Sequence, residues 1–269
     1  MNKKKATSPP TTGFTDAAIQ HAVDLQRWYD SRQGRYALDD LHAAVQEMTA
    51  DVFGYYALEM GLLVDRCNLL VDSRISTRVK MSANPLALGV DAFADAEALP
   101  VAIGNVDLVV ACHVLDYAHS PHQVLREIER VLVPDGHCVL IGFNPLSFRG
   151  MGLAGKWLRG RQGVPSVYTG FRIRDWFSVL GFEIIEMRTL SFRPGWGGER
   201  LFRRLEWLEH MGKKYQLPVG NLQVIHVRKQ VSRLTPIKST RRTSALLQPG
   251  MAVNSSTSRV TRLDTEHKE

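Results

Sequence analysis

The sequence predicts an α/β fold with a doubly wound, largely parallel sheet. From residue 55 onward, short apolar runs of strand length alternate with longer amphipathic stretches of helix length. Strands that alternate with helices are typical of βαβ units, which place helices on both faces of one sheet. The chain has 269 residues and a hydrophobic share of 44%, so it can bury a full core without disulfide bonds.

Six strands are predicted, each a short apolar run between polar or turn-forming segments. They cover residues 55–60, 78–81, 106–111, 138–143, 182–190 and 222–228. The stretch SPHQVLREIERVLVPDGH lies between the third and fourth of these strands and predicts a helix. Ser120 can cap it and Pro121 suits its first turn. One apolar face is expected from Val124, Leu125, Ile128, Val131 and Leu132.

Two further helices are predicted before the first strand, as a helical N-terminal extension. The first covers residues 15–33 with Thr15 as its N-cap, and the second covers residues 37–54. The apolar stripe of the second helix includes Phe53, and Gly54 is expected to end it. Residues 172–182, ended by Gly181, and residues 198–215 are predicted to be helical as well.

Both ends of the chain are basic and lack a hydrophobic pattern, so we expect them to be disordered tails. Residues 1–14 carry three lysines and no acid, and residues 232–269 carry seven basic and three acidic residues. The whole net charge of +7 therefore lies in the tails, because residues 15–231 balance at 24 against 24. We predict one domain over residues 15–231. The tails allow weak contact with nucleic acid or an anionic surface, or they only solubilise the chain.

The cysteine pattern and the N-terminus predict a cytoplasmic protein. Cys67, Cys112 and Cys138 are scattered and odd in number, which favours reduced thiols over a disulfide framework or a zinc site. The lysines at the N-terminus are not followed by an apolar segment, as a signal peptide would require. We expect no transmembrane segment, because no apolar run of about 18 residues occurs.

Residues 95–143 carry a family resemblance. DAEALP, NVDLVVACHVLDY and LREIERVLVPDGHCVLIGF follow one another in order. This stretch resembles class I S-adenosylmethionine-dependent methyltransferases of the type 11 group. DAEALP resembles the loop after the third strand, and NVDLVVACHVLDY resembles the fourth strand. LREIERVLVPDGHCVLIGF resembles the helix, turn and fifth strand that follow. The resemblance extends less firmly over residues 20–230. It implies a Rossmann-like sheet of seven strands and S-adenosylmethionine as the cofactor.

The resemblance also assigns residues to the cofactor by position. In the family, the turn after the first strand approaches the methionine part, and an acid in the DAEALP loop bonds the adenine amino group with help from the next backbone amide. The end of the fourth strand faces the sulfonium. The matching positions here are Glu59 and Gly61, then Asp95 and Ala96, then Ala111 and His113. Ligands of open α/β sheets lie at the carboxyl ends of the strands, where these residues are predicted.

The stretch LEMGLLVDR departs from the family pattern, which has an acid followed by G-x-G-x-G. Only Gly61 is kept, and larger apolar residues take the places where a ligand would approach the backbone. The family also has an acid at the end of its second strand, which holds the ribose hydroxyls. Either Asp72 is that acid, or residues 81–84 are the strand end.

His113 is the candidate general base, since it follows the fourth strand and an imidazole titrates near neutral pH. The alternative is a histidine that is hydrogen-bonded for structural reasons. Asp116 follows in the same loop, as a solvated acid or a partner. We expect no metal site, because His113, His119 and His122 straddle three elements without a carboxylate that completes a set.

Residues 149–174 hold six basic residues and no acid, in the position of a lid over the carboxyl edge. Arg149, Lys156, Arg159 and Arg161 are the candidates for attracting an anionic or large substrate. The alternative is a solvated basic loop.

Two functions remain open on the sequence alone. One is a methyltransferase that acts on an unidentified small-molecule or macromolecular acceptor. The other is a catalytically inactive binding or regulatory protein on the same fold, which the altered glycine loop favours. A nicotinamide dehydrogenase is excluded because G-x-G-x-x-G does not follow the first strand.

Overall fold

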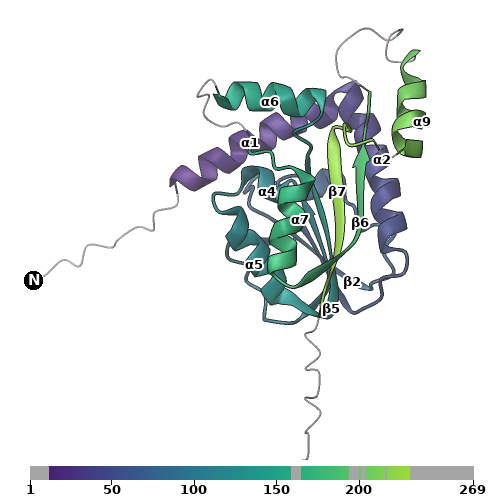
Figure 1. The fold of residues 1–269 in the computed structure, drawn as a ribbon. Coiled ribbons are helices and arrows are strands. Elements are labelled where there is room, and N and C mark those ends of the chain that lie inside the picture. Colours follow the sequence, from purple (N-terminus) through teal and green to yellow (C-terminus); the bar gives the residue numbers. More distant parts are fainter. Residues whose placement is uncertain (1–11, 159–164, 194–199, 201–203, 216, 231–269) are drawn as a thin grey trace, which may run out of the picture. The chain divides into compact units, whose positions relative to one another are not determined.

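The computed structural model describes residues 12–158, 165–193, 200, 204–215 and 217–230 (Figure 1). The chain divides into two compact units, Met1–Ser232 and Arg233–Glu269, and every described residue belongs to the first. Except for residues 12–14, the two predicted tails therefore lie outside the described residues. Residues 12–14 belong to the first helix, so that helix begins before Thr15, which we had expected to cap it.

The sheet has seven strands in the order β3-β2-β1-β4-β5-β7-β6, which confirms the predicted fold class. The strands are β1 (Tyr56–Gly61), β2 (Thr77–Ser82), β3 (Ala92–Phe93), β4 (Val106–Cys112), β5 (Leu132–Phe143), β6 (Phe182–Leu190) and β7 (Leu222–Lys229). All pairs are parallel except those of β7 with β5 and with β6. Only β3 was missed by the sequence, because two residues are too few to show an alternating pattern.

The strand order reverses between β1 and β4, which pair side by side in the middle of the sheet. At such a point the connections that follow the two strands run in opposite directions. A crevice therefore lies between them, beyond the carboxyl ends of the strands. Gly61 and Cys112 are register partners at these ends, so the turns that follow them lie next to each other.

Eight helices flank the sheet in the part of the chain that the structure describes. They are α1 (Thr12–Asp30), α2 (Arg32–Thr49), α3 (Val64–Cys67), α4 (Val114–Tyr117), α5 (Pro121–Val131), α6 (Phe148–Leu158), α7 (Gly170–Val179) and α9 (Glu206–Tyr215), with single helical residues at 200 and 204. In Figure 1, α1 and α6 lie together above the upper ends of the strands, whereas α5 and α7 lie along one face of the sheet.

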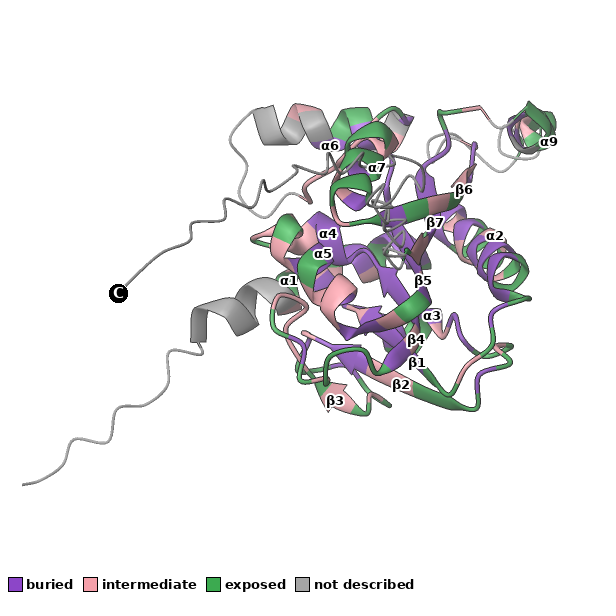
Figure 2. Ribbon diagram, turned by 60° about the horizontal axis from the view of Figure 1, so that its bottom comes forward, coloured by how far each residue is buried: buried purple, intermediate pink, exposed green. Residues whose placement is uncertain are grey.

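Two apolar cores lie on the two faces of the sheet, and alternate strand residues supply them. Leu108 and Val110 of β4 pack with α1, α2 and α3, while Val109 and Ala111 pack with α5 and α7. The central strands are buried on both sides, as Figure 2 shows. This accounts for their almost continuous apolar sequence.

The first two helices meet at a sharp corner that the sequence pattern did not predict. Ser31 caps α2, where its Oγ accepts a hydrogen bond from Gly34 N at 3.1 Å. A side chain at Gly34 would collide with the backbone of Trp28, so glycine permits the close approach. At its other end α2 stops at Thr49, before the predicted Gly54, and Phe53 is 66% exposed instead of lying in an apolar stripe.

The predicted helix before β5 ends one residue earlier than its apolar pattern suggests. Leu132, expected on the helix face, is the first residue of β5 and is fully buried there. The pairing between β4 and β5 shifts register at the start of β5. Val106 of β4 pairs with Leu132, but Leu108 of β4 pairs with His137. Asp135 takes a left-handed φ of 60° between these two pairs, so the predicted Pro-Asp-Gly turn is present as a bulge.

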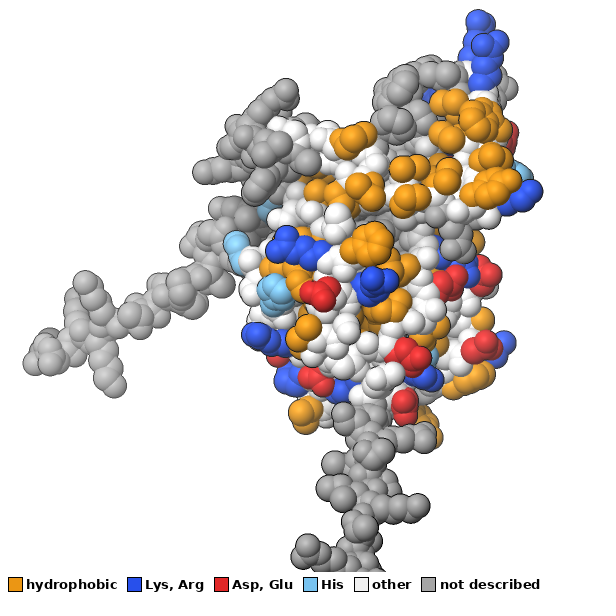
Figure 3. Space-filling view, in the orientation of Figure 1, with side chains coloured by type: hydrophobic (Ala, Val, Ile, Leu, Met, Phe, Trp, Pro, Cys, Tyr) orange, Lys and Arg blue, Asp and Glu red, His pale blue; other side chains and the backbone are white. Residues whose placement is uncertain are grey.

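Helix α9 presents an apolar stripe to solvent. Trp207, Met211 and Tyr215 recur every four residues and are 58%, 41% and 59% exposed. Figure 3 shows apolar side chains gathered at the upper right, over this helix. Its inner side fits against Phe192, whose ring would collide with any side chain at Gly212.

Two histidines form a hydrogen-bonded pair across β5 and β7, with 2.9 Å between His137 Nδ1 and His226 Nε2. The pKa of His226 is lowered to about 4, mainly by burial and to a smaller extent by the neighbouring His137. A histidine whose pKa is lower in the folded than in the unfolded chain stabilises the fold above the unfolded pKa. That stability is lost as the pH falls.

We therefore expect acid to weaken the fold through His226. Between pH 7.5 and pH 5 its contribution to the free energy of unfolding should fall by about 1–2 kcal/mol, from an unfolded pKa near 6.5 and some solvent screening. Urea unfolding of the wild type and of His226→Gln at both pH values measures this. The variant should lose less stability than the wild type, whereas His42→Gln, on α2, should match the wild type. An equal loss in His226→Gln would contradict the assignment.

Candidate active site

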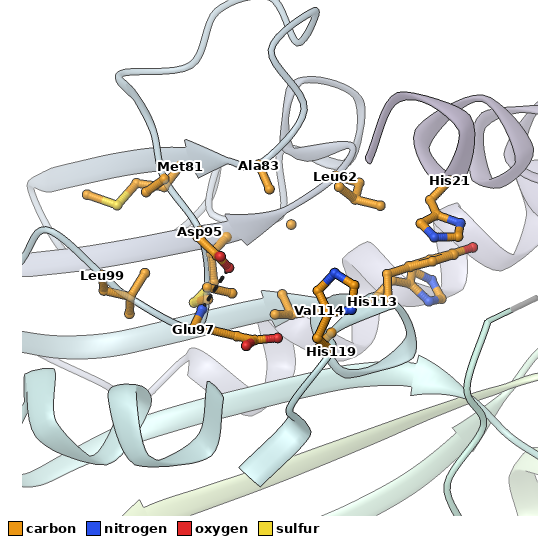
Figure 4. A pocket seen from close by; sticks show the side chains of 16 residues that line it. His21, Leu62, Met81, Ala83, Asp95, Glu97, Leu99, His113, Val114 and His119 are labelled. Carbon is orange, nitrogen blue, oxygen red and sulfur yellow. Dashed lines mark hydrogen bonds between the residues drawn. The ribbon is translucent and has the colours of Figure 1, made fainter. Parts of the chain in front are cut away.

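A pocket lies beyond the carboxyl ends of β1 and β4, at the point where the strand order reverses. The empty space between its walls, which includes open solvent, is about 700 Å³. In Figure 4, Met81, Leu99, Asp95 and Glu97 gather at one end of the pocket. His21 and His113 lie at the other end.

The loop after β3 brings Asp95 and Ala96 to the pocket wall, where the resemblance places the adenine contacts. Asp95 Oδ1 accepts a hydrogen bond from Glu97 N at 2.9 Å, which bends the loop around the carboxylate. Glu97 Oε1 in turn accepts from Ser120 N at 2.8 Å and fixes the loop to the start of α5. The second oxygen of Asp95 makes no hydrogen bond within the described residues.

The turn after β1 lines the pocket with Gly61 and Leu62. A side chain at Gly61 would collide with the carbonyl oxygen of Cys112 in the neighbouring strand β4. The next two residues, Leu63 and Val64, are buried in the fold and begin the short helix α3. Packing between strands is therefore sufficient to explain the one glycine that this turn keeps.

Glu59 and Ala111, two of the predicted cofactor residues, do not line the pocket. Both are fully buried within β1 and β4. Glu59 Oε1 accepts a hydrogen bond from Leu69 N at 3.0 Å, so this carboxyl holds the segment after α3 against the sheet. Burial raises the pKa of Glu59, and its other oxygen, Oε2, has no hydrogen-bond partner in the described chain.

Asp72 lies away from the pocket as well. It is exposed in the turn before β2, at the end of the sheet opposite to the carboxyl edge. The strand end is the alternative that the structure supports, because β2 stops at Ser82 and both Met81 and Ala83 line the pocket. No acid stands there: Asn84 Oδ1 accepts a hydrogen bond from Leu86 N at 3.1 Å within its own turn.

His113 lies at the pocket wall in the centre of a buried hydrogen-bonded chain. Its Nε2 is 2.8 Å from the hydroxyl of Tyr29, and its Nδ1 is 2.7 Å from Asp116 Oδ2. Asp116 Oδ2 also accepts a hydrogen bond from Phe143 N at 3.0 Å. An oxygen that accepts from a backbone N–H favours a carboxylate, which makes Nδ1 the donor and leaves Nε2 to accept from the tyrosine.

Because both ring nitrogens of His113 take part in these hydrogen bonds, neither nitrogen is free for a substrate. The residue is fully buried, and its backbone takes the left-handed φ of 56°, which is uncommon for a residue other than glycine. Burial raises the pKa of Tyr29 well above its usual range, which keeps the hydroxyl protonated as the donor. Of the two interpretations of His113, the geometry favours the structural one. Asp116 is buried, not solvated.

Arg149, the described member of the predicted substrate-binding arginines, is drawn inward. Its guanidinium lies 4.8 Å from the ring of Trp28 and 4.5 Å from the ring of Phe143. Burial lowers the pKa of Arg149, while Tyr117 and Tyr29 raise it. The residue joins α6 to α1 by cation–π contacts, so it does not serve as an exposed attractor. The side chain of Lys156, and Arg159 and Arg161, lie outside the described residues.

His21 is a pocket residue that sequence reasoning missed. It comes from α1 and its ring lies 4.7 Å from that of Tyr117, which also lines the pocket. Its only sequence signal is a polar residue between apolar positions of the first helix, and that pattern does not show which element the helix will cover.

Comparison with known proteins agrees with this fold. The family model described as a methyltransferase domain matches residues 61–140. The chain is 31% identical over 228 residues to the uncharacterized protein YafS of Escherichia coli strain K12, covering 82% of this chain and 89% of that protein. The chain belongs to the class I S-adenosylmethionine-dependent methyltransferase family, in its type 11 group.

Solved structures show the same fold at lower sequence identity. One is a Thermotoga maritima protein described as a SAM-dependent methyltransferase, possible histamine N-methyltransferase. It has a TM-score of 0.58, 17% identity and coverage of 81% of this chain and 100% of that chain. Another is the complex between the Haloferax volcanii Trm112 methyltransferase activator and the putative methyltransferase, with a TM-score of 0.57, 15% identity and coverage of 81% and 98%.

The collision at Gly61 predicts that this glycine is needed for stability without any ligand. Gly61→Ala should lower the free energy of unfolding by about 1–3 kcal/mol, because the new methyl group forces β1 and β4 apart. Chemical denaturation of the ligand-free protein measures this. Gly152→Ala is the control, since its side chain would meet open space in α6. Unchanged stability in Gly61→Ala would show that the glycine is kept for a ligand instead.

The buried chain through His113 predicts a cost for removing one hydroxyl. Tyr29→Phe leaves Nε2 of His113 buried without a donor, which should lower the free energy of unfolding by about 1–3 kcal/mol. Tyr55→Phe is the matched control, because Tyr55 is 77% exposed and should change stability by less than about 0.5 kcal/mol. Equal stability of the two variants in urea unfolding would mean that the hydrogen bond contributes nothing.

Proposed function

We propose that this protein is an S-adenosylmethionine-dependent methyltransferase that acts on an unidentified small-molecule or macromolecular acceptor. The observation that carries the proposal is the position of the pocket. It lies at the switch point of a methyltransferase sheet, and Gly61, Asp95 and Ala96 line it together. These are positions that the family resemblance assigns to the cofactor.

The pocket residues fit the cofactor well at the adenine end. Asp95 has one carboxylate oxygen without a partner in the described chain, and Ala96 lies beside it in the wall. Met60, Met81 and Leu99 supply an apolar surface for a flat ring. We propose that Asp95 accepts from the adenine amino group and that the turn at Gly61 lies beside the methionine part.

The fit is weaker at the ribose, because the end of β2 offers Ser82 and Asn84 in place of an acid. Ser82 Oγ accepts a hydrogen bond from Asn84 N at 3.1 Å, so part of this polar surface is used within the turn. We propose that the ribose is held less strongly here than in relatives with the acid.

When bound, S-adenosylmethionine supplies an already activated methyl group, so the protein mainly has to position an acceptor in line with it. The described residues serve that purpose by rigidity. The chain Tyr29–His113–Asp116 fixes the end of β4, and Arg149 fixes α6 against α1. We propose that α1 and α6 close the acceptor side and exclude water from it.

A binding or regulatory protein without catalysis is the second candidate. The specific observation in its favour is that packing against Cys112 explains Gly61 and that Leu63 and Val64 are buried, so the turn needs no ligand to account for its sequence.

We further propose a cytoplasmic location. All three cysteines are free and buried, as reduced thiols of that compartment would be. In the part of the chain that the structure describes, no helix has the length and apolar character needed to cross a membrane.

Calorimetric titration with S-adenosylhomocysteine tests the proposal. The wild type should bind with a micromolar dissociation constant, and Asp95→Ala should weaken binding by about 10–100-fold, as expected for losing a hydrogen bond to a charged group. Asp72→Ala is the matched control and should bind like the wild type, because Asp72 lies away from the pocket. Absence of binding at millimolar ligand by folded wild-type protein would overturn the enzyme assignment and favour the second candidate.

A further inference from the structure

The acceptor end of the pocket contains three rings that come from different segments. His21 comes from α1, Tyr117 ends α4, and His119 follows in the next loop. The rings of His21 and Tyr117 are 4.7 Å apart and tilted by 39°, so they form one continuous wall. Figure 4 shows His21 facing the pocket from the helix that crosses above it.

His21 differs from His113 in its hydrogen bonding. Both ring nitrogens of His113 are engaged, whereas neither nitrogen of His21 has a hydrogen-bond partner among the described residues. Nδ1 of His21 is buried, so a molecule in the pocket cannot reach it. Nε2 is not buried, and it is the nitrogen through which the ring can form a hydrogen bond with a bound molecule.

Burial favours the neutral form of the His21 ring. It is the largest effect and lowers the pKa of His21 below the usual value, whereas Asp24 on the same helix raises this pKa and His119, which also lines the pocket, lowers it. Tyr117 is a neutral neighbour, because burial raises the pKa of its hydroxyl. A neutral imidazole has one nitrogen with a free lone pair, which can accept a proton.

No lysine or arginine belongs to the described lining of this pocket. Arg149 lies against the rings of Trp28 and Phe143. The described lining of the pocket therefore contains no cation that could neutralise an anionic acceptor. It offers aromatic surface and a hydrogen-bond acceptor.

We propose that His21 is the acceptor-side base, and that the acceptor has an O–H or N–H group on a flat apolar body. This inference rests on the proposed function. The O–H or N–H bond of the acceptor breaks and its proton passes to the lone pair of His21. The electron pair left on the acceptor atom forms the new bond to the methyl carbon, while the pair of the broken carbon–sulfur bond stays on sulfur. A half-buried base of lowered pKa suits such a transfer near neutral pH.

Sinefungin provides a test that needs no acceptor. It resembles S-adenosylhomocysteine but carries an amine where the transferred methyl group would be. The cationic amine should donate to neutral His21 and be repelled once His21 is protonated. We expect the dissociation constant of sinefungin, divided by that of S-adenosylhomocysteine, to rise about tenfold from pH 7.5 to pH 5, which corresponds to one pKa unit of coupling.

The histidine variants decide which residue is responsible. In His21→Gln the ratio should be independent of pH, and in His119→Gln, the control at the same end of the pocket, it should still rise. A rise that persists in His21→Gln, or that disappears only in His119→Gln, overturns the inference while S-adenosylhomocysteine binding upholds the proposed function. If S-adenosylhomocysteine does not bind folded wild-type protein, the proposed function fails and the inference fails with it.

A second measurement avoids substitution altogether. Nuclear magnetic resonance titration of the wild type follows the His21 ring directly. Its pKa should be lower with sinefungin bound than with S-adenosylhomocysteine bound, because a neighbouring cation disfavours the charged imidazole. Identical titration in the two complexes would show that His21 does not face the methyl position.

Discussion

The hydrogen-bonded chain from Tyr29 through His113 to Asp116 connects parts of the fold that are far apart in sequence. Tyr29 belongs to the N-terminal helix, His113 ends β4, and Asp116 also bonds the backbone of β5 at Phe143. Because all three side chains are buried, each depends on the others for its hydrogen bonds, and loss of one leaves a buried polar group unpaired. The rest of the carboxyl edge is arranged around this constraint.

The position of α1 follows from that chain. The helix must bring Tyr29 to His113, and its corner with α2 is kept tight by Ser31 and Gly34. Arg149 adds a second connection, since its guanidinium lies against both Trp28 of α1 and Phe143 of β5. With the helix fixed in this way, His21, two turns before Tyr29, lies at the pocket wall. A structural requirement thus determines which residue faces the acceptor side.

The same constraint separates the two histidines by role. His113 is at the place where family resemblance suggests a catalytic group, yet the fold uses both of its nitrogens. His21 is contributed by the N-terminal extension and keeps both of its nitrogens free within the described chain. A methyltransferase that recruits its acceptor contacts from an added helix can change its acceptor without altering the sheet. This agrees with the general rule that function depends on sites built onto a fold.

Much of the fold could be predicted from sequence because its signals are local. Apolar runs identified six of the seven strands, and Gly181 marked the end of α7. The stretch 95–143 identified the family, and two residues predicted from it, Asp95 and Ala96, line the pocket. Local signals also misplaced some features. Asp72 and Glu59 have the right chemistry for a cofactor site, but one is exposed before β2 and the other is buried holding Leu69.

The sequence by itself indicated six of the seven strands and the helices α1, α2, α5, α7 and α9, because apolar period and turn residues depend on near neighbours. Only the tertiary structure decided the use of each polar side chain. Whether a histidine accepts from a tyrosine 84 positions away, as His113 does, or is left free, as His21 is, depends on how helices pack across the end of the sheet. Likewise, the neighbouring strand explains why residue 61 is a glycine, since the backbone of Cys112 comes close to it only after β1 and β4 have paired.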